Sequence, residues 1–311
     1  MTKPYVYLLV TMILFGTAFP SSKVAVGQLP HEVAAALRFG GAALVLILVL
    51  ALRRDSSRFS WRDLRTAGAP GLVGVFAYNL FFFWALTKAP AIDGSVIVPT
   101  MSPVLTTIAL VLTGRESASR RRVVGLALGV IGAVVFFVGI GGAVSGSHLA
   151  GDFLYLVAAA CWAFYSIASK KVLTGIDPLR ATTYATGVGA LALALVAIPA
   201  FPDTHWAEVS TTVWANIIFL AIGPTAVAYL FYYRALHSVS PSTATVAMFT
   251  VPVFGTAAAV TFLEESFTTL QIVGAVITIA GALLAVIKMS ARPGRNEVTL
   301  KEDACSGKTS R

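Results

Sequence analysis

The chain has 311 residues and a formal net charge of +9, yet only 12% of its residues are charged and 57% are hydrophobic. Soluble domains carry roughly 25% charged residues, so this supply cannot cover a water-facing surface. The composition excludes an ordinary soluble domain. We interpret the positive balance as loop lysine and arginine beside a membrane, not as a nucleic-acid-binding surface.

Apolar runs of about 20 residues, the length that crosses roughly 30 Å of hydrocarbon, alternate with short polar breaks. In hydrocarbon the backbone must satisfy its own hydrogen bonds, so each run is predicted to be a helix. Breaks such as 27–30 and 89–93 contain Gly, Pro or Asp. The ten predicted spans are 4–26, 32–52, 66–87, 92–113, 123–140, 152–172, 179–200, 213–235, 242–262 and 267–288.

Basic residues gather in the even-numbered connections and at both ends of the chain. The second connection carries a series of arginines from Arg53 to Arg65, whereas the first and third connections hold at most Lys23 and Lys88. Cytoplasmic loops of membrane proteins are enriched in Lys and Arg, so this bias predicts that both termini are cytoplasmic. An even number of spans agrees with that orientation.

Several residues recur at a nearly constant offset. Ser22-Lys23 recurs 147 residues later as Ser169-Lys170. Four further residues recur at an offset of 149: Pro103, Glu116, Gly125 and Gly132 match Pro252, Glu265, Gly274 and Gly281. Such self-similarity indicates an internal repeat, or, as the alternative, a merely structural duplication.

Each repeat would contain an odd number of spans, so the second must enter the membrane from the opposite side. The predicted fold is therefore an all-α integral membrane protein with ten transmembrane helices in two inverted five-helix repeats. The first repeat covers residues 1–147 and the second 148–289. A cytoplasmic polar tail, 290–311, is predicted to be disordered.

An ordered series of short motifs runs through both halves. The second half contains Gly151-Asp152, Trp162-Ala163, Lys170-Lys171, Gly223-Pro224-Thr225-Ala226, Arg234-Ala235-Leu236, Pro252-Val253, Glu264-Glu265, Gly274 and Gly281. The first half contains Phe15-Gly16, Lys23, Arg38-Phe39, Ala85-Leu86, Pro103 and Glu116. Over about residues 4–288 this set resembles EamA-type carriers of the drug/metabolite transporter superfamily.

The resemblance implies a carrier in a bacterial inner membrane. It is strongest to the bacterial branch that exports amino acids, particularly aromatic ones. One departure is that Phe15 stands where many members have Trp, which leaves that wall of the cavity less defined.

No acidic residue or histidine lies at the centre of a predicted span. All fourteen acidic residues and all four histidines fall in connections, at span ends or in the tail. Proton-coupled carriers usually bury a carboxylate or histidine along their pathway. We therefore expect a facilitator or exchanger without carboxylate-based proton coupling.

Arg38 is the one charge well inside a span. An arginine at the bilayer centre costs roughly 2.5–3.5 kcal/mol on insertion scales, which indicates a function. Two roles stay open: pairing with a substrate carboxylate, or hydrogen bonding to backbone carbonyls that ties helices together, which we favour slightly. Residues 185–187 of the second half offer no basic counterpart. Lys23, nearer a span end, is expected to snorkel to the interface.

Aromatic side chains gather deep within the spans. Tyr78 and Phe82 share a helix face at i, i+4, as do Tyr229 and Tyr233. Tyr and Trp usually mark membrane interfaces, but these lie too deep for that. The predicted lining of a central cavity, suited to a zwitterion with an apolar side chain, is Tyr78, Asn79, Phe82, Thr100, Trp162, Tyr165, Ser166, Tyr229, Tyr233 and Arg38.

Prolines and glycines indicate where helices bend or approach closely. Pro103 and Pro252 occupy equivalent places and remove helix hydrogen bonds. They are predicted to be paired hinges for alternating access, with passive kinking as the alternative. Gly125 and Gly129 form a GxxxG motif, which favours close helix contact.

Enzymes and ATP-driven pumps need groups that this sequence lacks. There is no HExxH motif and no histidine in a span centre, and Gly307-Lys308-Thr309 lacks the preceding strand and glycine of a phosphate-binding loop. We expect no catalytic residue, metal, cofactor, nucleic acid or ATPase subunit. The expected partners are a small-molecule substrate and membrane lipid, with the oligomeric state left open.

The expected function is secondary transport of small metabolites. An exporter or facilitator of amino acids, including aromatic and hydrophobic ones, fits best, working by alternating access at a central cavity between the repeats. The alternatives are a channel-like facilitator and a carrier for nucleosides, sugars or drugs.

Overall fold

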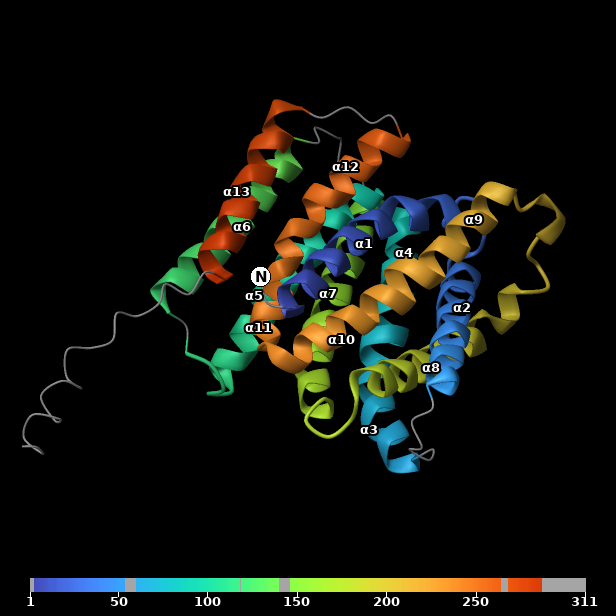
Figure 1. Cartoon of the computed structure of the whole chain (residues 1–311). Coiled ribbons are helices and arrows are strands. Elements are labelled where there is room, and N and C mark those ends of the chain that lie inside the picture. Colours follow the sequence, from blue (N-terminus) through green and yellow to red (C-terminus); the bar gives the residue numbers. More distant parts are fainter. Residues whose placement is uncertain (1–2, 54–59, 118, 140–145, 264–267, 287–311) are drawn as a thin grey trace, which may run out of the picture.

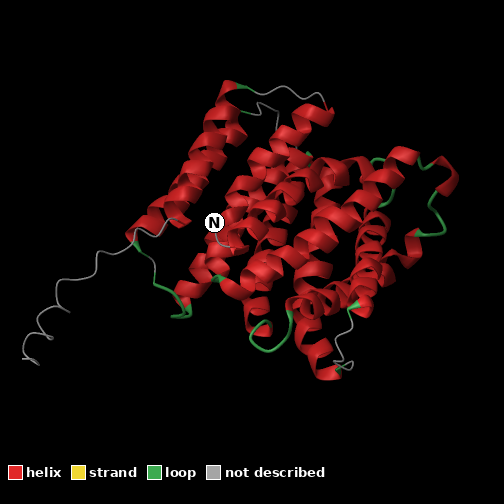
Figure 2. Ribbon diagram, viewed as in Figure 1, coloured by secondary structure: helices red, strands yellow, loops and turns green. Residues whose placement is uncertain are grey.

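The computed structural model describes residues 3–53, 60–117, 119–139, 146–263 and 268–286. Every regular element within these ranges is a helix (Figure 2). The tail expected to be disordered, 290–311, and the repeated Glu264-Glu265 motif lie outside the described residues.

The helices follow the predicted spans along the chain. The first half contains α1 (Lys3–Val26), α2 (His31–Leu52), α3 (Trp61–Gly71), the π-helix η1 (Leu72–Ala77), α4 (Tyr78–Lys88), α5 (Ala91–Leu112) and α6 (Arg120–Val138). The second half contains α7 (Gly146–Val172), α8 (Pro178–Ala197), η2 (Ile198–Ala200), η3 (Trp206–Glu208), α9 (Thr211–Leu220), the π-helix η4 (Ala221–Val227), α10 (Ala228–Ser238), α11 (Pro241–Val246), η5 (Ala247–Thr250), α12 (Val251–Leu263) and α13 (Thr269–Val286).

Within the described ranges, seven helical stretches are long and apolar enough to cross a membrane. They are Lys3–Val26, His31–Leu52, Trp61–Lys88, Ala91–Leu112, Gly146–Val172, Pro178–Ala200 and Thr211–Ser238. These correspond to the first four predicted spans and to the sixth, seventh and eighth. The all-helical, multi-pass architecture is therefore confirmed, and the full count of ten stays a prediction.

Several helices, α3 and α8 among them, start one to five residues before the predicted spans, because a capping residue begins the helix before its apolar run does. Ser60 caps α3, its Oγ accepting a hydrogen bond from the Asp63 backbone N–H at 3.2 Å. At α8 the Asp177 carboxylate accepts from the Leu179 N–H at 3.0 Å, with Pro178 in the first turn. Apolar periodicity marks the lipid-crossing part of a helix and omits these polar first turns.

Two π-helical segments, η1 and η4, interrupt long helices at equivalent places. Their first residues, Leu72 and Ala221, are 149 positions apart, the offset of the sequence repeat. Pro70 precedes the first segment and Pro224 lies inside the second, where a proline removes a backbone donor. Short π segments are rare and occur frequently at functional sites. Sequence analysis missed both of them.

The packing of helices is reciprocal between the halves. The pair α6–α13 forms one edge of the molecule, and α2 packs against α8 at the other side (Figure 1). Between these pairs, α1 packs against α10 and α12 of the second half. In turn, α7 packs against α4 and α5 of the first half.

Glycines allow α6 and α13 to approach at backbone distance. A Cβ added to Gly132 would lie 2.5 Å from the Thr278 nitrogen and 2.8 Å from the Gly274 oxygen. A Cβ added to Gly281 would lie 2.6 Å from the Gly125 oxygen. Only residues without side chains allow such proximity, so the close contact predicted from the GxxxG motif is confirmed.

Equivalent lysines cap equivalent helices. The Lys23 ammonium donates to the Leu86 carbonyl at 2.7 Å, near the C-terminus of α4. The Lys170 ammonium donates to the Leu236 carbonyl at the same distance, near the end of α10. Both cations sit where unpaired carbonyls give a helix its negative end. Lys23 therefore binds a neighbouring helix, instead of only snorkelling to the interface as expected.

Candidate functional site

A small central cavity lies where α1, α2, α4, α5, α7, α10 and the η5–α12 segment meet. About 20 Å³ is open to the centres of water-sized spheres, room for about one water molecule. The cavity is therefore nearly closed in this conformation. It is lined by Phe15, Ala18, Phe19, Arg38, Tyr78, Phe82, Val98, Pro99, Trp162, Tyr229, Met248 and Val251.

Trp162 is the centre of the aromatic wall. Its ring lies 5.3 Å from the rings of Phe15 and Tyr78 and 5.6 Å from that of Tyr229, centroid to centroid. The Phe15 and Tyr229 contacts are edge-to-face, an arrangement that aromatic pairs prefer. The Tyr232 ring of α10 lies 5.2 Å from the Trp162 ring, outside the cavity lining. The wall thus offers apolar surface.

Arg38 lies beside this wall with only 4% of the residue exposed. Its Nε donates to the Thr225 hydroxyl of η4 at 2.9 Å, and one terminal nitrogen donates to the Ser22 hydroxyl of α1 at 3.4 Å. The guanidinium carbon is 5.0 Å from the centroid of the Phe39 ring. Arg38 therefore ties helices together, the role favoured from sequence, but it does so through side-chain hydroxyls and not through backbone carbonyls.

No acidic side chain pairs with Arg38 in the described part of the chain. A buried charge is costly unless it is paired. The cavity therefore contains an uncompensated positive charge, which favours an anionic ligand group.

The structure separates the ten predicted lining residues into two sets. Arg38, Tyr78, Phe82, Trp162 and Tyr229 meet around the cavity. The others are buried outside its lining: Asn79, Thr100, Tyr165, Ser166 and Tyr233.

Three of the buried residues make structural hydrogen bonds, one within a span and two between helices. The Asn79 side-chain nitrogen donates to the Val75 carbonyl at 2.7 Å, within the span interrupted by η1. The Ser166 hydroxyl lies 2.7 Å from the Tyr232 hydroxyl, and Tyr233 bonds Ser169 at 2.8 Å. These two bonds fasten α7 to α10 behind the aromatic wall.

Sequence reasoning missed the purely apolar part of the lining. Phe15, Phe19, Met248 and Val251 line the cavity but resemble ordinary core residues in the sequence. Phe15 alone carried a usable signal, because it precedes Trp162 by 147 residues, the offset that relates Lys23 to Lys170. The repeat thus places two aromatic rings at equivalent positions, where they contact each other.

The two predicted hinge prolines lie in different local structures. Pro103 is inside α5, a single continuous α-helix. Pro252 is the second residue of α12, directly after the 3₁₀ segment η5. Their hinge role stays a prediction.

Asp93 corrects the expectation that no carboxylate is buried. Its side chain, in the first turn of α5, is 1% exposed, and its Oδ2 lies 2.5 Å from the His148 Nε2. Asp152 is the next acid on α7, 3.8 Å from the same nitrogen. The expected lack of carboxylate-based proton coupling rested on the absence of such a group, and Asp93 removes that basis.

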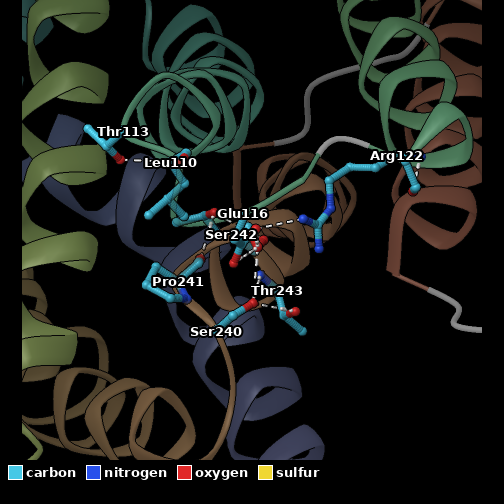
Figure 3. Close-up of polar contacts among 10 residues, drawn as sticks. Leu110, Thr113, Glu116, Arg122, Ser240, Pro241, Ser242 and Thr243 are labelled. Carbon is cyan, nitrogen blue, oxygen red and sulfur yellow. Dashed lines mark hydrogen bonds and ion pairs between the residues drawn. The ribbon is translucent and has the colours of Figure 1, made fainter.

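A second polar cluster lies beyond the other end of α5, in the connection to α6. The Glu116 carboxylate accepts a hydrogen bond from the Ser242 hydroxyl of α11 at 2.6 Å and pairs with Arg122 of α6 at 2.6 Å (Figure 3). The chain turns toward this site at Gly114, whose φ of 66° suits glycine. Glu116 thus links the first half to the start of α11 in the second half.

These features define a helical multi-pass membrane protein with a narrow, aromatic, positively charged central cavity. The model of the EamA-like transporter family matches the chain twice, over residues 2–138 and 149–287. The chain belongs to this family. Together the two matches cover almost all of the described helices.

Similar proteins are transporters by name. The chain is 26% identical over 287 residues to the uncharacterized transporter YyaM of Bacillus subtilis, covering 90% of this chain and 92% of that protein. It is 25% identical to a probable terminal-alkyne amino-acid exporter of Streptantibioticus cattleyicolor (89% and 91% covered). It is 28% identical to the aromatic amino acid exporter YddG of Ancylobacter novellus (70% and 75% covered).

A solved crystal structure shares the fold, with a TM-score of 0.72 and 20% identity, covering 91% of this chain and 97% of the other.

Proposed function

We propose that the chain is a secondary transporter that carries amino acids, including aromatic and hydrophobic ones, as an exporter or facilitator. The observation that carries the proposal is Arg38, a buried cation with no acidic partner among the described residues, beside an aromatic cavity. A substrate carboxylate would supply the missing negative charge.

The aromatic wall supports a substrate with an apolar or aromatic side chain. Phe15, Phe82 and Trp162 present carbon surface that would bury such a group. Two relatives are named as amino-acid exporters, one of them for aromatic amino acids. A nucleoside, sugar or drug carrier stays the alternative class of substrate.

We further propose ten transmembrane helices in two inverted repeats, residues 1–147 and 148–289. The two matches to the family model support this division. The glycine contacts support it too, since Gly125 and Gly132 match Gly274 and Gly281 in sequence, while Gly125 contacts Gly281 and Gly132 contacts Gly274. Reciprocal contacts of this kind are expected from a two-fold relation.

The orientation proposed is that both termini are cytoplasmic, in a bacterial inner membrane. Arg53 bonds Asp177 at 3.0 Å and Arg180 bonds Asp63 at 3.3 Å, so the second and sixth connections lie at the same end of the molecule. Both connections are rich in basic residues, which supports placing that end in the cytoplasm.

Transport would require the cavity to widen, because room for about one water cannot hold an amino acid. The proposed mechanism is alternating access, in which the cavity opens to one side at a time. The breaks η1, η4 and η5, with Pro103 and Pro252, are the proposed points of bending.

The test uses liposomes that contain only this protein. We expect saturable transport and counterflow of radiolabelled phenylalanine, and at least about 10-fold weaker transport of phenethylamine, which lacks the carboxylate. Equal transport of the amine would contradict the carboxylate role of Arg38. Flux that does not saturate would favour the channel-like alternative, and preference for a nucleoside or sugar would replace the substrate class.

A further inference from the structure

Three side chains that could ligate a metal ion meet at the end of α5 opposite Glu116. Asp93 comes from α5, whereas His148 and Asp152 come from one face of α7, four residues apart. One ligand atom from each residue lies within 4.8 Å of the other two. The grouping joins two helices, so spacing along the sequence could not reveal it.

The cluster has more negative charge than its surroundings compensate. With a neutral imidazole, the two carboxylates carry a formal charge of −2. Among the described residues, no lysine or arginine forms an ion pair with either acid. Burial of carboxylates without paired cations is unfavourable.

Two carboxylate oxygens here are also buried without hydrogen-bond partners. They are Oδ1 of Asp93, whose side chain is 1% exposed, and Oδ1 of Asp152. A proton shared between His148 and Asp93 would satisfy their 2.5 Å contact. It would leave both Oδ1 atoms unpaired and Asp152 Oδ2 at 3.8 Å from the imidazole nitrogen. A doubly charged ion would neutralise the cluster and offer both carboxylates a ligand bond.

We propose that Asp93, His148 and Asp152 form a binding site for one divalent transition-metal ion of the Zn²⁺ type. One imidazole nitrogen and two carboxylate oxygens make a three-ligand set, with water as the fourth ligand. The side chains of His148 and Asp152 are 20% and 21% exposed, which gives the ion and its water an entry. This proposal departs from the expectation of no metal site made from the sequence.

A bound ion would clamp the two family copies together. Asp93 belongs to the first match and Asp152 to the second. The same two helices carry Pro99 and Trp162 to the cavity wall. Zn²⁺ would therefore hold α5 against α7. Any opening of the cavity that requires these two helices to separate at this end would be slower.

The test measures Zn²⁺ binding to the full chain, purified in detergent with its affinity tag removed, by competition with a chromophoric zinc chelator. We expect one Zn²⁺ per chain. H148Q and D152N should each weaken binding by at least about 10-fold, the loss that even an outer-shell partner causes.

A matched control is available in the stretch before α9. Asp203, His205 and Glu208 form a second acid–histidine–acid series in the sequence, but they are exposed and do not gather into a metal-ligating group. The triple variant D203N/H205Q/E208Q should bind Zn²⁺ as the wild type does.

The proposal is overturned if the wild type shows no saturable binding, or if H148Q and D152N bind as tightly as it does. Loss of binding in the control variant would overturn it as well. Both test substitutions alter partly exposed side chains, so the answer does not depend on replacing the buried Asp93. Because binding is measured without transport, the result is independent of the proposed function.

Discussion

The two halves of the chain share their structural contacts but bury different charged groups. Lys23 caps α4 in the first half as Lys170 caps α10 in the second, and η1 and η4 interrupt equivalent helices. Arg38 has no such counterpart, since residues 185–187 contain no basic side chain. Asp93 also lacks an acidic counterpart, because the residue at the offset of 149 is Ser242.

This difference separates the scaffold from the site. A contact that recurs in both halves stabilises the same local packing twice and needs no ligand to explain it. A buried charge that occurs in one half alone costs free energy without serving the repeated packing. We therefore assign the unrepeated charges to ligand binding and the repeated contacts to folding, and the predictions below test that assignment.

The largest effect is expected from Arg38→Met. Removing the cavity's charge should lower phenylalanine transport by at least about 100-fold, equivalent to roughly 2.7 kcal/mol. Melting temperature should change little, because the loss of the hydrogen bonds to Thr225 and Ser22 is offset by removal of a buried unpaired charge, while the aliphatic part of the side chain is kept. Transport in liposomes and thermal unfolding in detergent measure the two quantities.

The control is Arg53→Gln at the end of the same helix. Arg53 forms a half-exposed ion pair with Asp177, so its loss should change stability by less than about 1 kcal/mol and leave transport nearly unchanged. A fall in melting temperature of Arg38→Met that matches its loss of transport would instead make Arg38 part of the scaffold.

A smaller and symmetrical effect is expected from Gly132→Ala and Gly281→Ala. Each new Cβ would meet backbone atoms of the partner helix at 2.5–2.6 Å, so α6 and α13 must move apart. Overpacking of this kind typically costs about 1–3 kcal/mol. Thermal unfolding should show similar losses for both variants.

Gly40→Ala is the matched control, because nothing lies within 4 Å of a Cβ built there. It should leave stability unchanged or raise it slightly, since alanine favours helix more than glycine does. If only one of Gly132 and Gly281 proved sensitive, the reciprocal packing of α6 and α13 would be disproved.

Sequence patterns located the helices well because length and hydropathy in a bilayer leave little choice of structure. They also identified Arg38, Tyr78, Phe82, Trp162 and Tyr229, whose polarity or size is unusual deep in a span. What they missed depends on contacts between helices distant in sequence.

The missed features show that limit. Asp93 is at a helix end, where a carboxylate normally reaches water, and only the packing of α7 against α5 buries it. Tyr165 and Tyr233 share helix faces with the lining residues Trp162 and Tyr229, but their side chains are buried outside the cavity lining. The π segments η1 and η4 depart from a constant period of 3.6 residues, so a helical pattern could not predict them.

An intermediate effect is expected from Phe15→Trp, which makes the two halves alike at the positions of Phe15 and Trp162. The larger ring would fill a cavity that already has room for about one water. Phenylalanine transport should therefore fall by about 10-fold, roughly 1.4 kcal/mol, while smaller alanine is less affected. The control is Phe164→Trp, which changes a half-exposed side chain of α7. It should transport phenylalanine and alanine as the wild type does. Equal loss for both amino acids in Phe15→Trp would indicate general misfolding.

The smallest effect is expected from the paired caps, Lys23→Met and Lys170→Met. Lys23→Met removes the hydrogen bond to Leu86, and Lys170→Met removes those to Leu236 and His237, and each variant should cost about 1 kcal/mol of unfolding free energy. The bonds to Leu86 and Leu236 have the same length and the bond to His237 is exposed, so the losses should agree within about 0.5 kcal/mol, the usual range for neutral surface changes. Lys171→Met is the neighbouring control, whose side chain is exposed and makes no hydrogen bond in the described structure. Thermal unfolding of the three variants measures these losses, and equal losses for Lys23→Met and Lys170→Met would show that the contact stabilises both halves. Transport in liposomes is measured beside it. A transport defect confined to one of the two variants would assign that lysine to the site and not to the scaffold.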